Sequence, residues 1–89
     1  MNVVYARCAG FDVHKKTVVV NVRTPEQVVT RTYGSMTGDL LELSDWLLGQ
    51  GITHIAMEST GEYWKPIFNI LEGAFEVILV NAQHLKTVS

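Results

Sequence analysis

The N-terminal part of the chain contains three short runs rich in β-branched residues, and two short connections join them. The runs lie at residues 3–9, 17–23 and 28–33, and one face of the 17–23 run consists of valines. Pro25 bends the second connection, as proline does in turns. Because connections this short join antiparallel neighbours, the sequence predicts a three-stranded antiparallel meander.

The remainder of the chain alternates between helical and strand patterns. Two segments carry apolar residues at helical spacing, and a short apolar run typical of a strand follows each of them. A helix that crosses between strands of one sheet normally makes them parallel, so the fourth strand is expected beside the first. We therefore predict an α/β fold: a mixed five-stranded sheet in which the meander is followed by α-β-α-β, with helices packed on the sheet. The later elements are expected between Thr37 and Gly49, then at 52–57, 62–71 and 75–80.

Particular residues are expected to cap or cover these two helices. Thr37 is expected to cap the first helix, and Leu41 and Leu48 to widen its apolar stripe. In the second helix, Tyr63 is expected on the inward face. Pro66 is expected in the first turn, where its missing N–H group costs nothing.

The composition fits one small domain with a hydrophobic core. Of the 89 residues, 47% are hydrophobic and 18% are charged, which argues against disorder. The net charge of -2 gives no support for nucleic-acid binding, but it does not exclude a local basic patch. Cys8 is the only cysteine and is expected in the core, so a reducing, cytoplasmic location is expected. No apolar run reaches the length of a membrane span, and no membrane partner is expected.

Two acidic residues follow apolar runs that are expected to form neighbouring strands. Asp12 comes after the first run and Glu58 after the 52–57 run, so both are expected just past the carboxyl ends of those strands, where ligands gather in α/β sheets. Carboxylates are typical ligands of Mg²⁺ or Mn²⁺. The hypothesis is a catalytic divalent-metal site built on Asp12 and Glu58. The alternative is a turn-forming aspartate and a solvated glutamate.

Polar segments beside this pair are candidate contacts to phosphate groups. The basic segment after Asp12 suits a nucleic-acid contact, or a solvated hairpin end. The segment after Glu58 is expected to open the second helix, whose N–H groups could bind an anion, although ordinary capping explains it equally well. His54 is expected to be structural. The candidate nucleic-acid contacts are His14, Lys15, Lys16, Ser59, Thr60 and Lys65.

Several of these segments together resemble the DEDD insertion-sequence transposases of the IS110 type. The resemblance extends over nearly the whole chain, and its first two blocks are specific in combination. The segments are Gly10-Phe11-Asp12-Val13-His14-Lys15-Lys16, Ala56-Met57-Glu58-Ser59-Thr60-Gly61 with Tyr63-Trp64-Lys65-Pro66, and Val80-Asn81-Ala82 with His84 and Lys86.

The resemblance implies a fold, a reaction and partners. Proteins of that family are DNA recombinases guided by a structured bridge RNA, and their N-terminal domain is similar to RuvC resolvase and RNase H. Four acids in that domain bind divalent metal, and a serine in a separate domain attacks DNA. Asp12 matches the first acid and Glu58 the second, and the other two are expected beyond Ser89. Residues 1–89 are then expected to form the N-terminal part of a single RuvC-like domain, inactive by itself and prone to form homo-oligomers.

Two other functions remain open at this point. Actin-like ATPases have a related sheet with an aspartate after the first strand, but they use a glycine-containing phosphate loop, and the segment from Val13 to Lys16 contains no glycine. A non-catalytic module that binds RNA, DNA or a protein is the second alternative. Loss or survival of DNA exchange when Asp12 and Glu58 are replaced in the whole protein would separate these possibilities.

Overall fold

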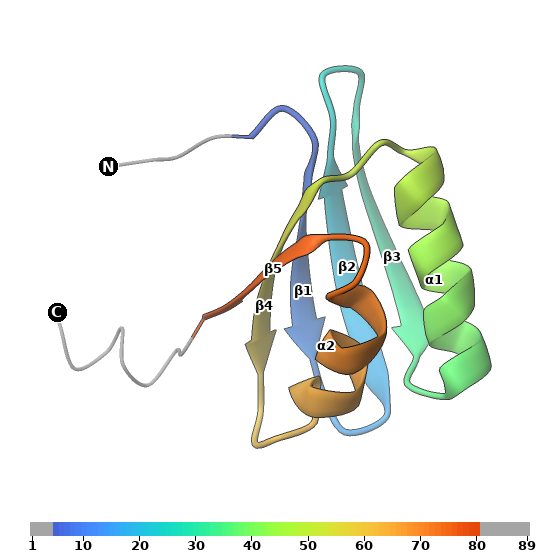
Figure 1. Ribbon diagram of the computed structural model, residues 1–89, viewed down its shortest axis with the longest axis vertical. Coiled ribbons are helices and arrows are strands. Elements are labelled where there is room, and N and C mark those ends of the chain that lie inside the picture. The colour runs from blue at the N-terminus through green and yellow to red at the C-terminus, as the bar shows by residue number, and fades with distance from the viewer. Residues whose placement is uncertain (1–4, 81–89) are drawn as a thin grey trace, which may run out of the picture.

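Five strands form one mixed sheet in the computed structural model, which describes residues 5–80 (Figure 1). The elements are β1 (Cys8–Val13), β2 (Thr17–Arg23), β3 (Val28–Gly34), α1 (Thr37–Gly49), β4 (His54–Ser59), α2 (Trp64–Leu71) and β5 (Glu76–Val80). The order across the sheet is β3-β2-β1-β4-β5. The first three strands pair antiparallel, whereas β4 is parallel to both β1 and β5. The predicted α/β fold and mixed five-stranded sheet are confirmed.

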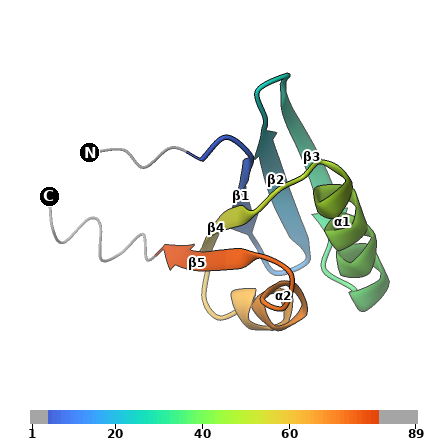
Figure 2. The same ribbon diagram turned by 45° about the horizontal axis from the view of Figure 1, so that its top comes forward.

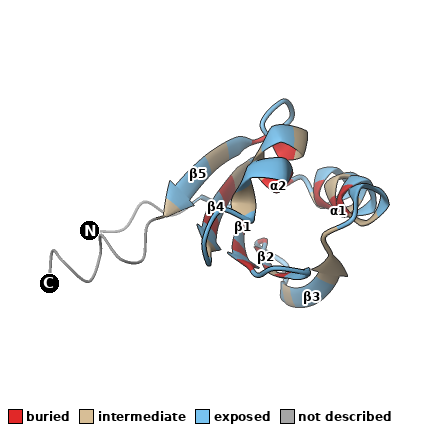
Figure 3. Ribbon diagram, turned by 90° about the horizontal axis from the view of Figure 1, so that it is seen from below, coloured by how far each residue is buried: buried red, intermediate tan, exposed pale blue. Residues whose placement is uncertain are grey.

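Both helices pack on the same face of the sheet, as Figures 2 and 3 show. Residues of β1, β2 and β4 alternate between buried and more exposed positions, as expected when one face of a sheet is covered. Leu40, Leu43 and Leu47 of α1 and Ile67 and Leu71 of α2 fill the core on the covered face. Within residues 5–80, neither helix is long and apolar enough to cross a membrane.

The other face of the sheet carries no helix within residues 5–80, and we refer to it as the open face. Cys8 lies on this face and is only partly buried, so its expected place in the core is wrong. The open face is formed by Cys8, Gly10 and Asp12 of β1, Val19, Asn21 and Arg23 of β2, His54, Ala56 and Glu58 of β4, and Ile78 and Val80 of β5.

The first strand is placed later in the chain than expected. β1 begins at Cys8 and runs through Gly10 and Asp12 to Val13, although the strand was expected to end at residue 9, ahead of both residues. Both face the open side, where a small or polar residue needs no apolar partner, while Phe11 and Val13 are buried against the helices. The first residues of the predicted strand, 3 and 4, lie outside the described part.

Several helix-end and helix-face predictions also need correction. The N-cap of α1 is Met36, with no side-chain cap hydrogen bond, and Thr37 is the first helical residue. Leu41 and Leu48 are 53% and 51% exposed, because the side of α1 that faces the core carries Leu40, Leu43, Trp46 and Leu47 instead. Tyr63 precedes α2 and is 43% exposed. Pro66 does lie in the first turn of α2, as predicted.

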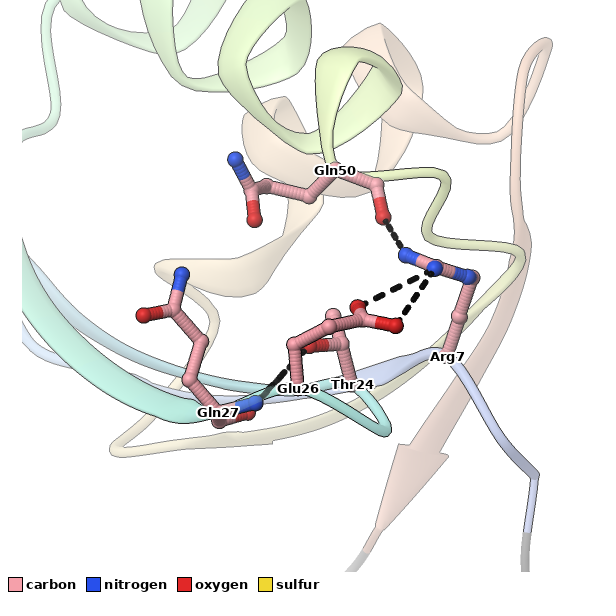
Figure 4. Close-up of polar contacts among 5 residues, drawn as sticks. All are labelled: Arg7, Thr24, Glu26, Gln27 and Gln50. Carbon is pink, nitrogen blue, oxygen red and sulfur yellow. Dashed lines mark hydrogen bonds and ion pairs between the residues drawn. The ribbon is translucent and has the colours of Figure 1, made fainter.

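Arg7 joins three segments that are distant in the sequence (Figure 4). Its guanidinium donates to the carbonyl oxygen of Gln50 at the end of α1, with an N–O distance of 2.6 Å, where a cation suits the helix dipole. It also forms an ion pair of 3.1 Å with Glu26 in the β2–β3 turn. These contacts fix the segment that leads into β1 and thereby help to set which residues enter that strand.

Candidate functional site

Asp12 and Glu58 lie directly opposite each other on the parallel strands β1 and β4. Neighbouring strands are about 4.8 Å apart, so the two carboxylates share one patch of surface. Each residue is the second-last of its strand, because Val13 and Ser59 still pair beyond them. The expected position just past the strand ends is therefore wrong by a small margin, but the two acids are neighbours, as the strand order predicted.

A shallow hollow surrounds the two acids on the open face. Its volume is about 320 Å³. Both side chains are accessible, and the side chain of Asp12 is 59% exposed. Access of this kind suits groups that meet a ligand from solution. The hollow is lined by Gly10, Phe11, Asp12, Val19, Asn21, Ala56, Glu58 and Val80.

His14 holds the carboxylate of Asp12 from the β1–β2 turn. Its Nε2 atom lies 3.1 Å from Oδ2 of Asp12, and its backbone N–H donates to Thr17 to close the turn. This contact restrains the Asp12 side chain when no ligand is bound. Lys15 and Lys16 occupy the same turn and are exposed, so two further basic residues follow Asp12 and His14 in the chain.

The donor set fits a hard divalent cation. Two exposed carboxylates on adjacent strands supply oxygen ligands, and Mg²⁺ commonly binds through one or two carboxylates together with water or substrate phosphate. Within residues 5–80, no group of three or more His, Cys, Asp and Glu side chains has the geometry of a metal site. Asp12 and Glu58 therefore form a pair of possible ligands and not an enclosed metal cage.

The remaining candidate residues do not converge on this pair. Ser59 ends β4 and its hydroxyl donates to the carbonyl of Thr60, while the N–H of Thr60 donates to Val13 and extends the parallel pairing. Neither residue caps α2, since that helix begins at Trp64, so the expectation that the segment after Glu58 opens the helix is wrong. Lys65 forms an ion pair with Glu62. Hydrogen bonding and charge attraction from Lys65 lower the pKa of Glu62 from its ordinary value of 4.5.

His54, which was expected to be structural, is half-buried and stacks on the exposed ring of Tyr5. It is the first residue of β4, and its ring stacks face to face on that of Tyr5, with centroids 3.7 Å apart and planes at 8°. The alternation His54, Ala56, Glu58 along β4 already implies that the imidazole shares a face with the acid. Tyr5 carries no such signal, because it lies ahead of the strand.

Comparisons with known proteins identify one family. A family model described as a transposase, of the DEDD IS110 type, matches residues 9–89. No curated protein matches the chain. The solved structures that match include a Ppx/GppA family member from Aquifex aeolicus, at 7% identity and a TM-score of 0.48, covering 88% of this chain and 36% of that one. Another is a PPX-GPPA enzyme from Aquifex aeolicus, at 8% identity and a TM-score of 0.47, with the same two coverages of 88% and 36%.

The present chain thus spans 36% of the length of each of these solved chains. The family match, by contrast, extends over nearly all of the chain and includes both Asp12 and Glu58. The chain belongs to the IS110-type family of DEDD transposases.

Proposed function

We propose that this chain supplies part of the catalytic domain of a DNA transposase, in which Asp12 and Glu58 bind a divalent metal ion used in strand cleavage and exchange. Membership of the transposase family supports the reaction class. The strand order β3-β2-β1-β4-β5, with three antiparallel strands followed by two parallel ones, supports an RNase H-like (RuvC-like) type of fold.

The observation that carries the proposal is the register of the two acids. Asp12 and Glu58 are opposite each other on an accessible face of central strands. Like charges placed directly opposite are unfavourable in a sheet, so a cation between them has a favourable place. Mg²⁺ or Mn²⁺ would there neutralise charge on a DNA phosphate. Asp12 and Glu58 provide the oxygen ligands, and His14 keeps Asp12 in place before the ion arrives.

DNA and a structured guide RNA are the proposed partners of the whole protein. Lys15 and Lys16 are exposed in the turn that follows β1 and suit phosphate contacts that position a strand. Self-association is also proposed, through β5. This strand lies at the edge of the sheet and exposes Ile78 and Leu79 by 50% and 40%, and unpaired edges of this kind favour pairing with another chain.

Metal binding can be tested on the chain itself with Mn²⁺, whose unpaired electrons broaden nearby NMR signals. We expect Mn²⁺ to broaden the backbone amides of residues 10–13 and 56–59 first, and Mg²⁺ to reverse the effect. The double variant Asp12→Asn, Glu58→Gln should lose this broadening. Glu42→Gln, which removes an exposed acid from α1, is the matched control and should keep it.

Two results would contradict the proposal. One is broadening that is centred elsewhere or that survives in the double variant. The other is DNA exchange by the whole transposase when both acids are replaced. The chain of 89 residues, with two of the acids, is expected neither to cleave nor to join DNA alone.

The alternative functions gain no support from the described residues. The turn between β1 and β2 consists of His14, Lys15 and Lys16 and offers no glycine for the phosphate loop of an actin-like ATPase. A purely non-catalytic binding module does not account for two acids in register on an open face.

A further inference from the structure

β3 is an edge of the sheet, and within residues 5–80 its outer side is unpaired. It pairs with β2 in continuous register, and no described strand lies beyond it (Figure 1). The backbone N–H of Thr24 donates to the carbonyl of Gln27 across the β2–β3 turn. Since bonded and non-bonded pairs alternate along an antiparallel ladder, the N–H and C=O groups of Val28, Thr30 and Thr32 point outward. β3 therefore offers these backbone groups to a further strand.

Most of the usual protections against strand addition are missing from this edge. Natural edge strands are kept free by proline, lysine, bulges, short length or a charge that points inward. β3 is seven residues long and contains neither proline nor lysine, and its register with β2 shows no bulge. Its only charged residue is Arg31. The placement of this one side chain therefore decides whether the edge is blocked.

The side chain of Arg31 is held against α1. Its partner in register, Val20, is buried, so Arg31 projects on the side of the sheet that the helices cover. The guanidinium carbon lies 4.0 Å from the centre of the Trp46 ring, and Nη1 donates to the hydroxyl of Tyr33 at 3.3 Å. These two contacts fix the position of the charge and leave the outer backbone of β3 accessible.

Arg31 is exposed, and no ion pair within residues 5–80 includes it. Arginine, tryptophan and tyrosine are the residue types enriched in binding hot spots, and a planar guanidinium loses little freedom when it pairs with a carboxylate. In an added antiparallel strand, the residue opposite Arg31 would form a non-hydrogen-bonded pair, in which side chains lie closest together. A carboxylate at that position would be complementary to Arg31 in charge and in place.

We propose that β3 is a docking edge for an extended segment of a partner protein, which adds an antiparallel strand and places a carboxylate opposite Arg31. Backbone hydrogen bonds supply affinity in this mode of recognition, and alternate side chains select the partner. β3 of a second copy does not supply the carboxylate, because the strand contains no acidic residue. The proposal concerns an edge of the sheet away from Asp12 and Glu58 and does not depend on metal binding.

Titration of the 89-residue chain with the peptide Thr-Val-Thr-Glu-Thr-Val-Thr, followed by NMR, tests the docking edge. The backbone amide signals of β3 should shift more than those of any other strand. The amides of Thr30 and Thr32 should also exchange their hydrogens more slowly, because the added strand bonds them. The control is the same peptide with N-methyl groups on its third and fifth residues, which would face Thr32 and Thr30. It should not bind, since methylation removes the two N–H donors that pair with β3.

The charged pair is tested by changing each of its two partners. Replacement of the glutamate in the peptide by glutamine should weaken binding to the unchanged chain about threefold. The same replacement should have no effect on binding to Arg31→Gln, because the cation that it would pair with is gone. Arg23→Gln, which removes an exposed arginine of β2, is the matched control and should respond to the peptide change as the unchanged chain does.

Several outcomes would overturn the proposal. They are the absence of binding at millimolar peptide, amide shifts centred on β5, equal binding of the methylated and unmethylated peptides, and an equal loss on the glutamate change with and without Arg31. Slow exchange of Thr30 and Thr32 in the concentrated chain without peptide would assign the edge to a second copy and would overturn the assignment to a partner protein.

Discussion

The two faces of the sheet differ in what they contribute, although they are made from alternate residues of the same strands. On the covered face, Phe11 and Met57 are at most 3% exposed and belong to the same core as the buried residues of both helices. On the open face, their direct neighbours Asp12 and Glu58 are accessible. Hydrophobic burial therefore stabilises the fold from one side, and the other side is available for charged and small residues that would be costly in a core.

The largest expected change in the free energy of unfolding comes from a substitution on the covered face. Met57→Ala should lower the free energy of unfolding by about 2–5 kcal/mol, because it leaves a cavity between β4 and the helices that cover it. Ala56→Thr changes the next residue, on the open face, and should shift the free energy by less than about 0.5 kcal/mol. Urea denaturation of both variants measures the difference. Equal decreases in the free energy of unfolding for the two variants would show that both faces of the sheet are packed.

A substitution on the open face is expected to change the free energy of unfolding by less, and to raise it. Glu58→Gln removes the like charge opposite Asp12 but keeps the contact between Asp12 and His14. It should therefore raise the free energy of unfolding by about 0.2–1 kcal/mol in the absence of metal. Addition of Mg²⁺ should reverse the order, because only the unchanged chain gains stability from the ion. Thermal melts with EDTA and with Mg²⁺ check this, and destabilisation by Glu58→Gln in EDTA would contradict it.

The smallest expected effect on stability comes from the ion pair of Glu62 and Lys65, which lies away from both faces, and it depends on pH. Lys65 lowers the pKa of Glu62 below its ordinary value of 4.5, so the folded state binds this proton less readily than the unfolded state does. The resulting stabilisation is present above the ordinary pKa and is lost as the pH falls through the lowered one. Melting temperatures of Glu62→Gln and the unchanged chain should therefore converge as the pH falls from neutral to below the ordinary pKa of 4.5. If the difference between the two melting temperatures did not change with pH, the ion pair would not be its cause.

The sequence predicted the meander and the place of β4 beside β1, because short connections join antiparallel neighbours and a crossover helix joins parallel strands; the place of β5 beside β4 was not predicted. The boundaries of β2 were also predicted correctly, since valines fill its buried positions at 18, 20 and 22. The start of β1 was not, because Gly10 and Asp12 resemble strand breakers until one knows that they face an open side. Leu41 and Leu48 were misplaced for a similar reason, since periodicity does not determine how wide a stripe the neighbouring elements cover.

The candidate site was predicted in part. Parallel pairing of the first and fourth strands made Asp12 and Glu58 neighbours, but their in-register pairing depends on where β1 and β4 begin, which periodicity does not fix. The hollow around the two acids and the stack of Tyr5 on His54 were not predicted. The hollow is lined by Gly10 and Ala56, which are opposite each other, and Tyr5 reaches His54 from outside the sheet.

The parallel pairing of β1 with β4 also bears on the order of events during synthesis. The antiparallel meander needs only contacts between residues that are close in sequence, and such contacts form quickly. The pairing of Asp12 with Glu58 must wait until α1 and β4 have left the ribosome, because these segments close the crossover. A nascent chain can therefore form its hairpin before Asp12 and Glu58 meet, and under the proposed function metal binding would report that the crossover has closed.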